Sequence, residues 1–247
     1  MSFKDHFSAQ AAGYARARPN YPSALFTELA RLAPGNELAW DAGTGNGQAA
    51  IALAQHFKQV VATEPSAAQL AQASMHPRVQ YHRSAETAPM LGNGTVDLVT
   101  VAQAAHWFDR TAFYAEVKRV MRPGGAVALW VYELCLVTPE IDAILQRFYR
   151  GPIWACWPPE RRHVEAGYRD FDFPFREVKF PRFDMVHTWT LCEFADYLRT
   201  WSSVTRFIRE SGVDPVVALM VELAPLWGSE SRKIRWPLSG RLGFMPT

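Results

Sequence analysis

Short apolar runs alternate with amphipathic stretches between Glu37 and about Leu136. The apolar runs have the length of buried strands, and the amphipathic stretches repeat apolar residues with the spacing of a helix. Strands are expected at residues 38–40, 60–63, 79–82, 96–101 and 126–132. Helices are expected at residues 47–57 and 67–74, and again after residue 109. Strands and helices that alternate with short connections predict an α/β fold, in which helices cover both faces of a mainly parallel sheet.

Residues that start or stop regular structure mark several of these boundaries. Pro65 ends the second strand, and Ser66 is a good N-cap for the helix that follows. Asp109 is expected to cap the last helix of this half in the same way. The run Arg122-Pro123-Gly124-Gly125 predicts a sharp stop and a turn before the strand at residues 126–132.

The pattern changes beyond Thr138. Residues 154–175 are rich in aromatic residues and proline without clear periodicity. Helices are expected at residues 141–148, 194–201 and 213–223, and an extended segment at 232–244. We therefore expect a helical cap at residues 1–36, a sheet core at 37–137, an inserted helical and aromatic lid with a sheet-edge strand at 138–230, and a closing strand at 231–247.

Composition narrows the class of protein. At 247 residues the chain suits one domain with a small cap, and its 49% hydrophobic and 20% charged residues are ordinary for a soluble globular protein. Its three cysteines form no Cys-x-x-Cys pair, which argues against a disulfide framework or a zinc site and fits a reducing cytoplasm. The charged N-terminus is unlike a signal peptide, and no stretch has the roughly 18 apolar residues that span a bilayer. We expect a cytoplasmic protein, monomeric or homodimeric, without a metal or a membrane contact.

Charge adds two observations. A net charge of +2 without a basic cluster argues against a nucleic-acid partner. Of the 26 basic residues, 21 are Arg, whose rigid fork suits carboxylates and phosphates. A genome that favours Arg codons explains this bias equally well.

Ligands of open parallel sheets bind beyond the carboxyl ends of the strands. This topology places four distinctive segments on one rim. They are the glycine loop at residues 41–47, Glu64, residues 84–86 and residues 103–107.

The glycine loop has Gly43, Gly45 and Gly47 directly after a strand. Dinucleotide-binding enzymes use a similar loop, but their last fingerprint glycine is replaced here by Gln48. The carboxylate of Asp41 would repel a pyrophosphate and attract a cationic ligand. An NAD-linked oxidoreductase is therefore the weaker interpretation.

Glu64 ends the second strand 17 residues after Gly47. This is close to the offset of roughly 20 residues at which an acidic residue meets ribose hydroxyls. We expect Glu64 to bind a ribose diol through charge-assisted hydrogen bonds.

The motifs follow one another in a known order, as Asp41-x-Gly43-x-Gly45-x-Gly47-Gln48, Glu64-Pro65-Ser66, Ser84-Ala85-Glu86, residues 103–108 and residues 122–125. This order resembles the class I S-adenosylmethionine-dependent methyltransferases, within them the methyltransferase type 11 group, and in particular the trans-aconitate methyltransferases and their relatives. The resemblance covers residues 7–130 and includes the stretch around Tyr14 and Arg18. It implies a Rossmann-like, doubly wound, seven-stranded sheet and S-adenosylmethionine as the cofactor.

The resemblance also implies a set of cofactor-binding residues. They are Tyr14, Arg18, Asp41, Gly43, Thr44, Gly45, Glu64, Pro65, Ser66, Gln69, Ser84, Ala85, Glu86, Gln103, Ala104 and Trp107. The glycine loop would face the methionine moiety and Glu64 the ribose. Thr44 replaces a Cys of many relatives, a change that we expect the site to tolerate. Packing explains Tyr14, Arg18 and Trp107 about equally well.

A small-molecule methyl acceptor is the expected partner, and O-methylation of a small organic acid is the preferred hypothesis. A carboxylate needs no base, whereas a hydroxyl or amine acceptor would need one, and His106 is then the catalytic candidate. Possible clamps for an acid are Arg18, Arg161, Arg162 and Arg206. A non-catalytic cofactor-binding module, and N- or C-methylation of a small apolar acceptor, remain the alternatives.

Overall fold

The computed structural model describes residues 19–247, so the predicted site residues Tyr14 and Arg18 lie outside the described part of the chain. Its strands are β1 Leu38–Ala42, β2 Gln59–Thr63, β3 Val79–His82, β4 Val96–Ala102, β5 Met121–Tyr132, β6 Arg176–Val178, β7 Asp184–Trp189 and β8 Arg232–Phe244. They lie in the order β3-β2-β1-β4-β5-β8-β6, with β7 paired to β8 beside this order. Neighbours among β1 to β5 are parallel, and β8 is antiparallel to β5, β6 and β7.

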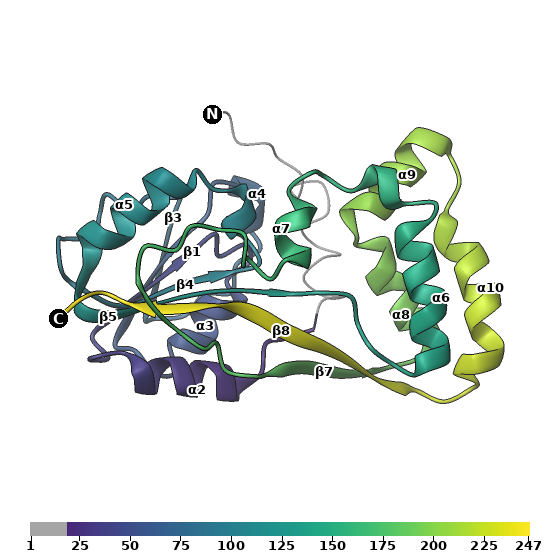
Figure 1. Cartoon of the computed structure of the whole chain (residues 1–247), viewed down its shortest axis with the longest axis horizontal. Helices are drawn as coiled ribbons and strands as arrows, with labels where there is room; N and C mark the ends of the chain where they lie inside the picture. The colour runs from purple at the N-terminus through teal and green to yellow at the C-terminus, as the bar shows by residue number, and fades with distance from the viewer. Residues whose placement is uncertain (1–18) are drawn as a thin grey trace.

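This topology confirms the expected α/β, Rossmann-like and mainly parallel fold (Figure 1). The continuous order contains the seven expected strands. Among the described residues, β7 is an eighth strand, which pairs along the first half of β8 from Arg232 to Pro237.

The two faces of β5 enter two different hydrophobic cores, because successive side chains of a strand point to opposite sides of a sheet. Ala126, Ala128 and Trp130 pack in one core with α2 (Ser23–Leu32) and α3 (Gln48–Leu53). Val127, Leu129 and Val131 pack in the other core with α5 (Arg110–Val120). The strand is buried on both faces, which explains why its sequence is a continuous apolar run rather than an alternating one.

Two predicted helices are shorter than expected. The helix α3 ends at Leu53 instead of residue 57, and α4 (Ala67–Leu70) ends four residues before the predicted end. In both cases the chain continues beyond the helix in a 3₁₀-like turn, whose hydrogen bonds run from N–H of residue i to C=O of residue i−3, such as His56 N to Leu53 O at 2.8 Å. The predicted caps of α4 and α5 are present, since Ser66 accepts from Gln69 N and Asp109 accepts from two amides of the first turn.

The predicted turn at residues 122–125 is wrong in one respect. These residues already belong to β5, which begins at Met121. A register shift against β4 between Val96 and Leu98 accommodates them, and Gly124 has a φ of 72°. An irregularity in the strand pairing therefore replaces a separate turn.

Beyond β5 the described chain is mainly helical. Its helices are α6 Pro139–Arg150, α7 Arg161–Glu165, α8 Leu191–Arg199, α9 Ser202–Ser211 and α10 Pro215–Trp227, with short 3₁₀ helices η2 Ala105–Trp107 in the sheet half and η3 Trp154–Cys156. Figure 1 shows α6, α8, α9 and α10 together at one end of the sheet, with α7 between them and the strands. The sequence pattern predicts α6, α8, α10 and β8, but not α7, α9 or β7.

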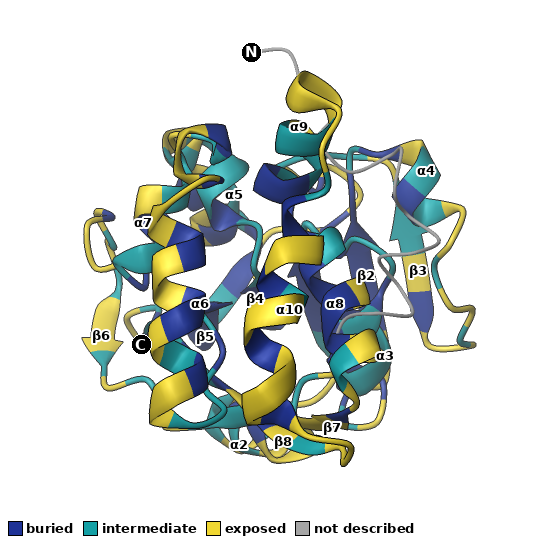
Figure 2. Cartoon of the chain, turned by 90° about the vertical axis from the view of Figure 1, so that its right-hand side faces the viewer, coloured by how far each residue is buried: buried dark blue, intermediate teal, exposed yellow. Residues whose placement is uncertain are grey.

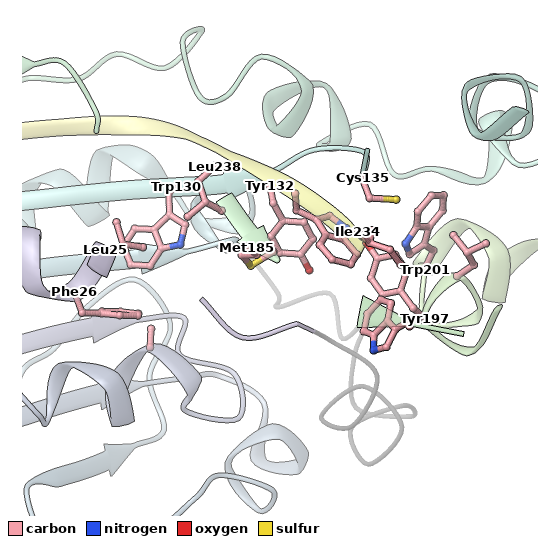
Figure 3. Packing of buried hydrophobic residues seen from close by; sticks show 14 of the residues in the cluster. Leu25, Phe26, Trp130, Tyr132, Cys135, Met185, Tyr197, Trp201, Ile234 and Leu238 are labelled. Carbon is pink, nitrogen blue, oxygen red and sulfur yellow. Dashed lines mark hydrogen bonds between the residues drawn. The ribbon is translucent and has the colours of Figure 1, made fainter. Parts of the chain in front are cut away.

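The helical end is not a separate core. Leu25 and Phe26 on α2 belong to the same buried cluster as Trp130, Tyr197 and the residues around them (Figure 3). In Figure 2, α6 and α10 turn exposed residues outward and buried ones inward. This shared core fixes the helical end against the strand ends that form the site. No helix of the described residues is long and apolar enough to cross a bilayer.

Candidate active site

A cavity of about 600 Å³ lies at the carboxyl ends of β1, β2 and β4. It is lined by most of the predicted site residues that the structure describes, together with residues that the sequence did not indicate. The predicted ones are Gly43, Thr44, Gly45, Glu64, Pro65, Gln69, Ala85, Glu86, Gln103, Ala104, His106 and Trp107. The others are Pro19, Tyr21, Asn46, Gln48, Ala49, Ala102, Phe108, Asp109, Tyr132 and Glu160.

Three predicted residues, Asp41, Ser66 and Ser84, are not among those that line the cavity. Asp41 is fully buried, and its two carboxylate oxygens accept from the hydroxyls of Thr44 at 2.5 Å and Thr100 at 2.7 Å. Ser66 caps α4, and the Ser84 hydroxyl donates to the carbonyl of Thr87. Asp41 therefore supports the glycine loop through Thr44, and its direct contact with a ligand stays a prediction.

Glu64 fastens the glycine loop to the end of β2. Its Oε2 accepts from the amide of Gly45 at 3.0 Å, and its Oε1 accepts from the amide of Ser66 at 3.0 Å. Glu64 also lines the cavity. The carboxylate is thus held rigidly at the place where a diol would bind.

The three glycines of the loop are required for different reasons. A Cβ on Gly43 would collide with Ala104, and one on Gly47 would collide with the Tyr81 hydroxyl, so these two positions are set by packing. A Cβ on Gly45 would meet only Gln69 Oε1, at 4.0 Å. The space beside Gly45 is open because it belongs to the cavity.

Gln69 Oε1 is buried and has no hydrogen-bond partner among residues 19–247. A buried acceptor without a donor is costly in an empty site and is satisfied by a ligand that brings an N–H or O–H group. The open space at Gly45 and the acceptors of Glu64 and Gln69 therefore fit a ligand with a ribose and an adenine.

Burial raises the pKa of Asp41 to about 6. The hydrogen bonds from Thr44 and Thr100 oppose this rise, and the charge of Glu64 adds to it. A cationic ligand near the loop would favour the charged carboxylate, because an opposite charge stabilises the ionised form.

A second cavity of about 70 Å³ adjoins the first. The two cavities share Gln103, His106, Trp107 and Tyr132. Residues of the helical half complete the smaller one, among them Trp157, Arg161, Tyr197 and Trp201. These four shared residues, called the aperture below, lie between the two cavities near the end of β4, so a bound group that passed them would reach from one cavity into the other.

Gln103 is strained at this aperture. Its φ is 58°, in the left-handed region that costs a non-glycine residue of the order of 1–3 kcal/mol. Its side-chain amide donates to the carbonyl of Tyr132 at 3.3 Å, and its buried Oε1 has no partner. Backbone strain beside an unsatisfied acceptor marks the aperture as a site shaped for a ligand.

His106 lies on η2 with Nδ1 at 2.9 Å from the hydroxyl of Tyr168. Burial lowers the pKa of His106 to about 3, and the positive charges of Arg161 and His163 act in the same direction. At neutral pH the imidazole is uncharged. It is a weak base, which disfavours the general-base role considered from the sequence.

Of the candidate clamps that the structure describes, Arg161 alone lines a cavity. Its Nε donates to the Tyr149 hydroxyl at 2.8 Å, and its guanidinium lies 4.6 Å from the centre of the Trp157 ring. Arg162 is exposed, and Arg206 is exposed and paired with Glu210. The described residues contain no cluster of His, Cys, Asp or Glu that could hold a metal ion.

Comparison with known proteins identifies the family. Residues 40–129 match a family described as a methyltransferase domain. A protein of Dictyostelium discoideum that is named as a methyltransferase is 33% identical over 216 residues, which cover 86% of this chain and 82% of that protein.

Solved structures agree with this match. A structure from Anaeromyxobacter dehalogenans, named as a type II methyltransferase, is 42% identical with a TM-score of 0.88 and covers 93% of this chain and 99% of that chain. A phosphoethanolamine N-methyltransferase of Haemonchus contortus, solved with S-adenosylhomocysteine, shares the fold at 16% identity and a TM-score of 0.52, over 100% of this chain and 61% of that chain. Shared sequence, fold and cofactor cavity together place this chain among the class I S-adenosylmethionine-dependent methyltransferases.

Proposed function

We propose that this enzyme transfers the methyl group of S-adenosylmethionine to a carboxylate oxygen of a small organic acid. The observation that carries the proposal is the position of Arg161, whose side chain lines the small cavity on the far side of the shared aperture. The likeness of the sequence motifs to trans-aconitate methyltransferases points the same way.

The large cavity is the proposed cofactor site. Glu64 would hold the ribose hydroxyls, Gln69 Oε1 would accept from the ligand, and the open side of Gly45 would admit it. When bound there, S-adenosylmethionine supplies an electrophilic methyl group on a sulfonium. Gln103, Ala104 and Trp107 then wall the methyl-transfer point.

The small cavity is rich in donors. The Arg161 guanidinium has donors besides the one used by Tyr149, and the buried Trp157 indole Nε1 has no partner within the described part of the chain. His106 has one ring nitrogen left after its bond to Tyr168. A set of N–H donors near a cation, partly removed from water, suits an anionic acceptor.

A carboxylate acceptor fits the weak basicity of His106. The carboxylate is already nucleophilic, and the lowered pKa of His106 makes this residue a poor proton acceptor at neutral pH. The remaining work of the protein is to align acceptor and methyl donor and to exclude water. The aromatic walls of Trp157, Tyr197 and Trp201 suit that exclusion.

The same aromatic walls favour a second candidate, N- or C-methylation of a small apolar acceptor. Transfer of a radiolabelled methyl group to a panel of acids, phenols and amines distinguishes the two. The acid proposal expects products from acids only, and expects their label to be released by mild alkali. Alkali-stable products from amines or phenols, with no product from any acid, would contradict it.

A further inference from the structure

Tyr168 has a backbone conformation that its residue type disfavours. Its φ is 61°, directly after Gly167 with a φ of 57°, and its side chain is fully buried. A bulky residue in the left-handed region persists only where surrounding contacts over-determine it, and such positions cluster at functional sites. The strained segment follows α7, the helix that carries Arg161.

Several contacts hold Tyr168 in place. Its ring stacks on Phe171 at 4.7 Å between centroids, and its carbonyl accepts from Arg241 at 3.2 Å. Its hydroxyl lies 2.9 Å from His106 Nδ1. The first two contacts fix the ring and the backbone, whereas the hydroxyl reaches into the site.

The direction of the hydrogen bond to His106 follows from the acceptors around the Tyr168 hydroxyl. Among the described residues, His106 Nδ1 is the acceptor within hydrogen-bond distance of this buried hydroxyl, at 2.9 Å. Burial raises the pKa of Tyr168 far above its ordinary value, so the hydroxyl keeps its single proton. Since a buried O–H group without an acceptor is costly, that proton is directed to His106 Nδ1. Nδ1 is then the acceptor of the imidazole, and Nε2 carries the ring proton.

We infer that Tyr168 is a positioning residue that locks His106 in the Nε2-protonated tautomer, so that His106 offers a donor to the methyl acceptor. This inference rests on the proposed acid substrate for its functional part. Nε2 has no hydrogen-bond partner among the described residues, and His106 lines both cavities. A fixed Nε2–H beside Arg161 orients a carboxylate with one oxygen towards the aperture.

Selection of one tautomer also requires that His106 is neutral. Burial of His106 and the nearby Arg161 charge, with a smaller contribution from His163, oppose protonation of the imidazole, and the His163 ring is itself hydrogen bonded to Asp170 at 2.5 Å. A neutral imidazole has one donor nitrogen, and the hydrogen bond with the Tyr168 hydroxyl determines which nitrogen carries the proton. Without the hydroxyl, both tautomers become accessible.

The test uses the full chain with labelled histidine rings, and nitrogen NMR at neutral pH reports the tautomer of His106. The His106→Gln variant assigns its signals. Tyr168→Phe keeps the ring and removes the hydroxyl. Tyr114→Phe is the matched control, because Tyr114 is also buried but its hydroxyl has no hydrogen-bond partner.

We expect the Nε2-protonated signature in the wild type and in Tyr114→Phe, and a mixture of tautomers in Tyr168→Phe. The KM of the acid acceptor should rise on the order of tenfold in Tyr168→Phe, with kcat changed much less, since one oriented hydrogen bond is lost. An Nδ1-protonated wild type, or an unchanged tautomer in Tyr168→Phe, overturns the inference without any activity measurement. A changed tautomer with an unchanged acceptor KM overturns the role in substrate orientation. If the wild type shows the expected tautomer but methylates no acid, the proposed function fails and the tautomer lock stands.

Discussion

The amide of Gly45 donates to Glu64 Oε2 at 3.0 Å, which joins the loop after β1 to the end of β2. The second oxygen of Glu64 binds the amide of Ser66 at the start of α4. One carboxylate thus links the glycine loop to the start of α4 at the edge of the cavity.

Replacing Glu64 with Gln should weaken S-adenosylmethionine binding. Charge-assisted hydrogen bonds contribute about 1.5–3 kcal/mol each, so loss of one raises Kd about 10- to 100-fold. Glu37→Gln is the control, because Glu37 is an exposed acid paired with Lys58 away from the cavity. Isothermal titration measures both variants. Equal affinities in Glu64→Gln and in the wild type would contradict the assignment of Glu64 to the ribose.

Gly45→Ala separates the role of the cavity from that of backbone strain. Gly45 has a φ of 59° and Gly94 one of 63°, so Ala at either position bears a similar conformational cost of roughly 1–2 kcal/mol. Gly94 is exposed, and nothing lies within 4 Å of an added Cβ. Both variants should therefore lose a few degrees of Tm. Only Gly45→Ala should also lose cofactor affinity, because its methyl group occupies ligand space. Titration calorimetry measures the cofactor affinity of both variants, and thermal melts measure their Tm. Equal affinity in both variants would count against the cavity as the cofactor site.

Cofactor binding should release protons near pH 6. Burial raises the pKa of Asp41 from 3.8 to about 6, so the free protein holds a proton there as the pH falls through this value. The positive charge of the bound cofactor favours the carboxylate, and affinity should therefore increase as the pH rises through about 6. Titrations in two buffers with different ionisation enthalpies measure the release. Asp41→Asn should abolish it, and an undiminished release in this variant would assign the proton to another group.

Arg161→Gln should raise the KM of the acid acceptor about 10- to 100-fold, which corresponds to the loss of one charged hydrogen-bond donor. Cofactor affinity should stay within about threefold, because Arg161 lines only the small cavity. Arg162→Gln is the matched control, since this neighbour is exposed and lines neither cavity. Steady-state methylation of the best acid provides both constants. A normal acceptor KM in Arg161→Gln would rule out Arg161 as the clamp.

Features that depend on local sequence were predicted well. The strand β8 has the predicted bounds of residues 232–244, and the capping roles of Ser66 and Asp109 are confirmed. The cavity collects Gly45, Glu64 and Gln69 because parallel strands end on the same rim, a consequence of the topology that the alternating pattern already implied.

Features that depend on contacts between residues far apart in the sequence could not be predicted. Asp41 meets Thr100 across 59 positions, and this contact helps to hold the buried carboxylate beneath the glycine loop. His106 meets Tyr168 across 62 positions, so its tautomer and its lowered pKa depend on a segment that has no clear periodicity. The pattern also missed α9 and β7. In β7 only Met185 and Trp189 of the six residues are buried, so this strand gives no alternating signal.

The measurement that tests the central claim most directly traces the oxygen that receives the methyl group. An acid acceptor labelled with heavy oxygen in its carboxylate is methylated by the enzyme and S-adenosylmethionine, and the product is treated with mild alkali. Ester hydrolysis breaks the acyl–oxygen bond, so carboxylate methylation predicts methanol that contains the heavy oxygen. Methyl groups that stay bound in alkali, or methanol without the label, would contradict O-methylation of a carboxylate.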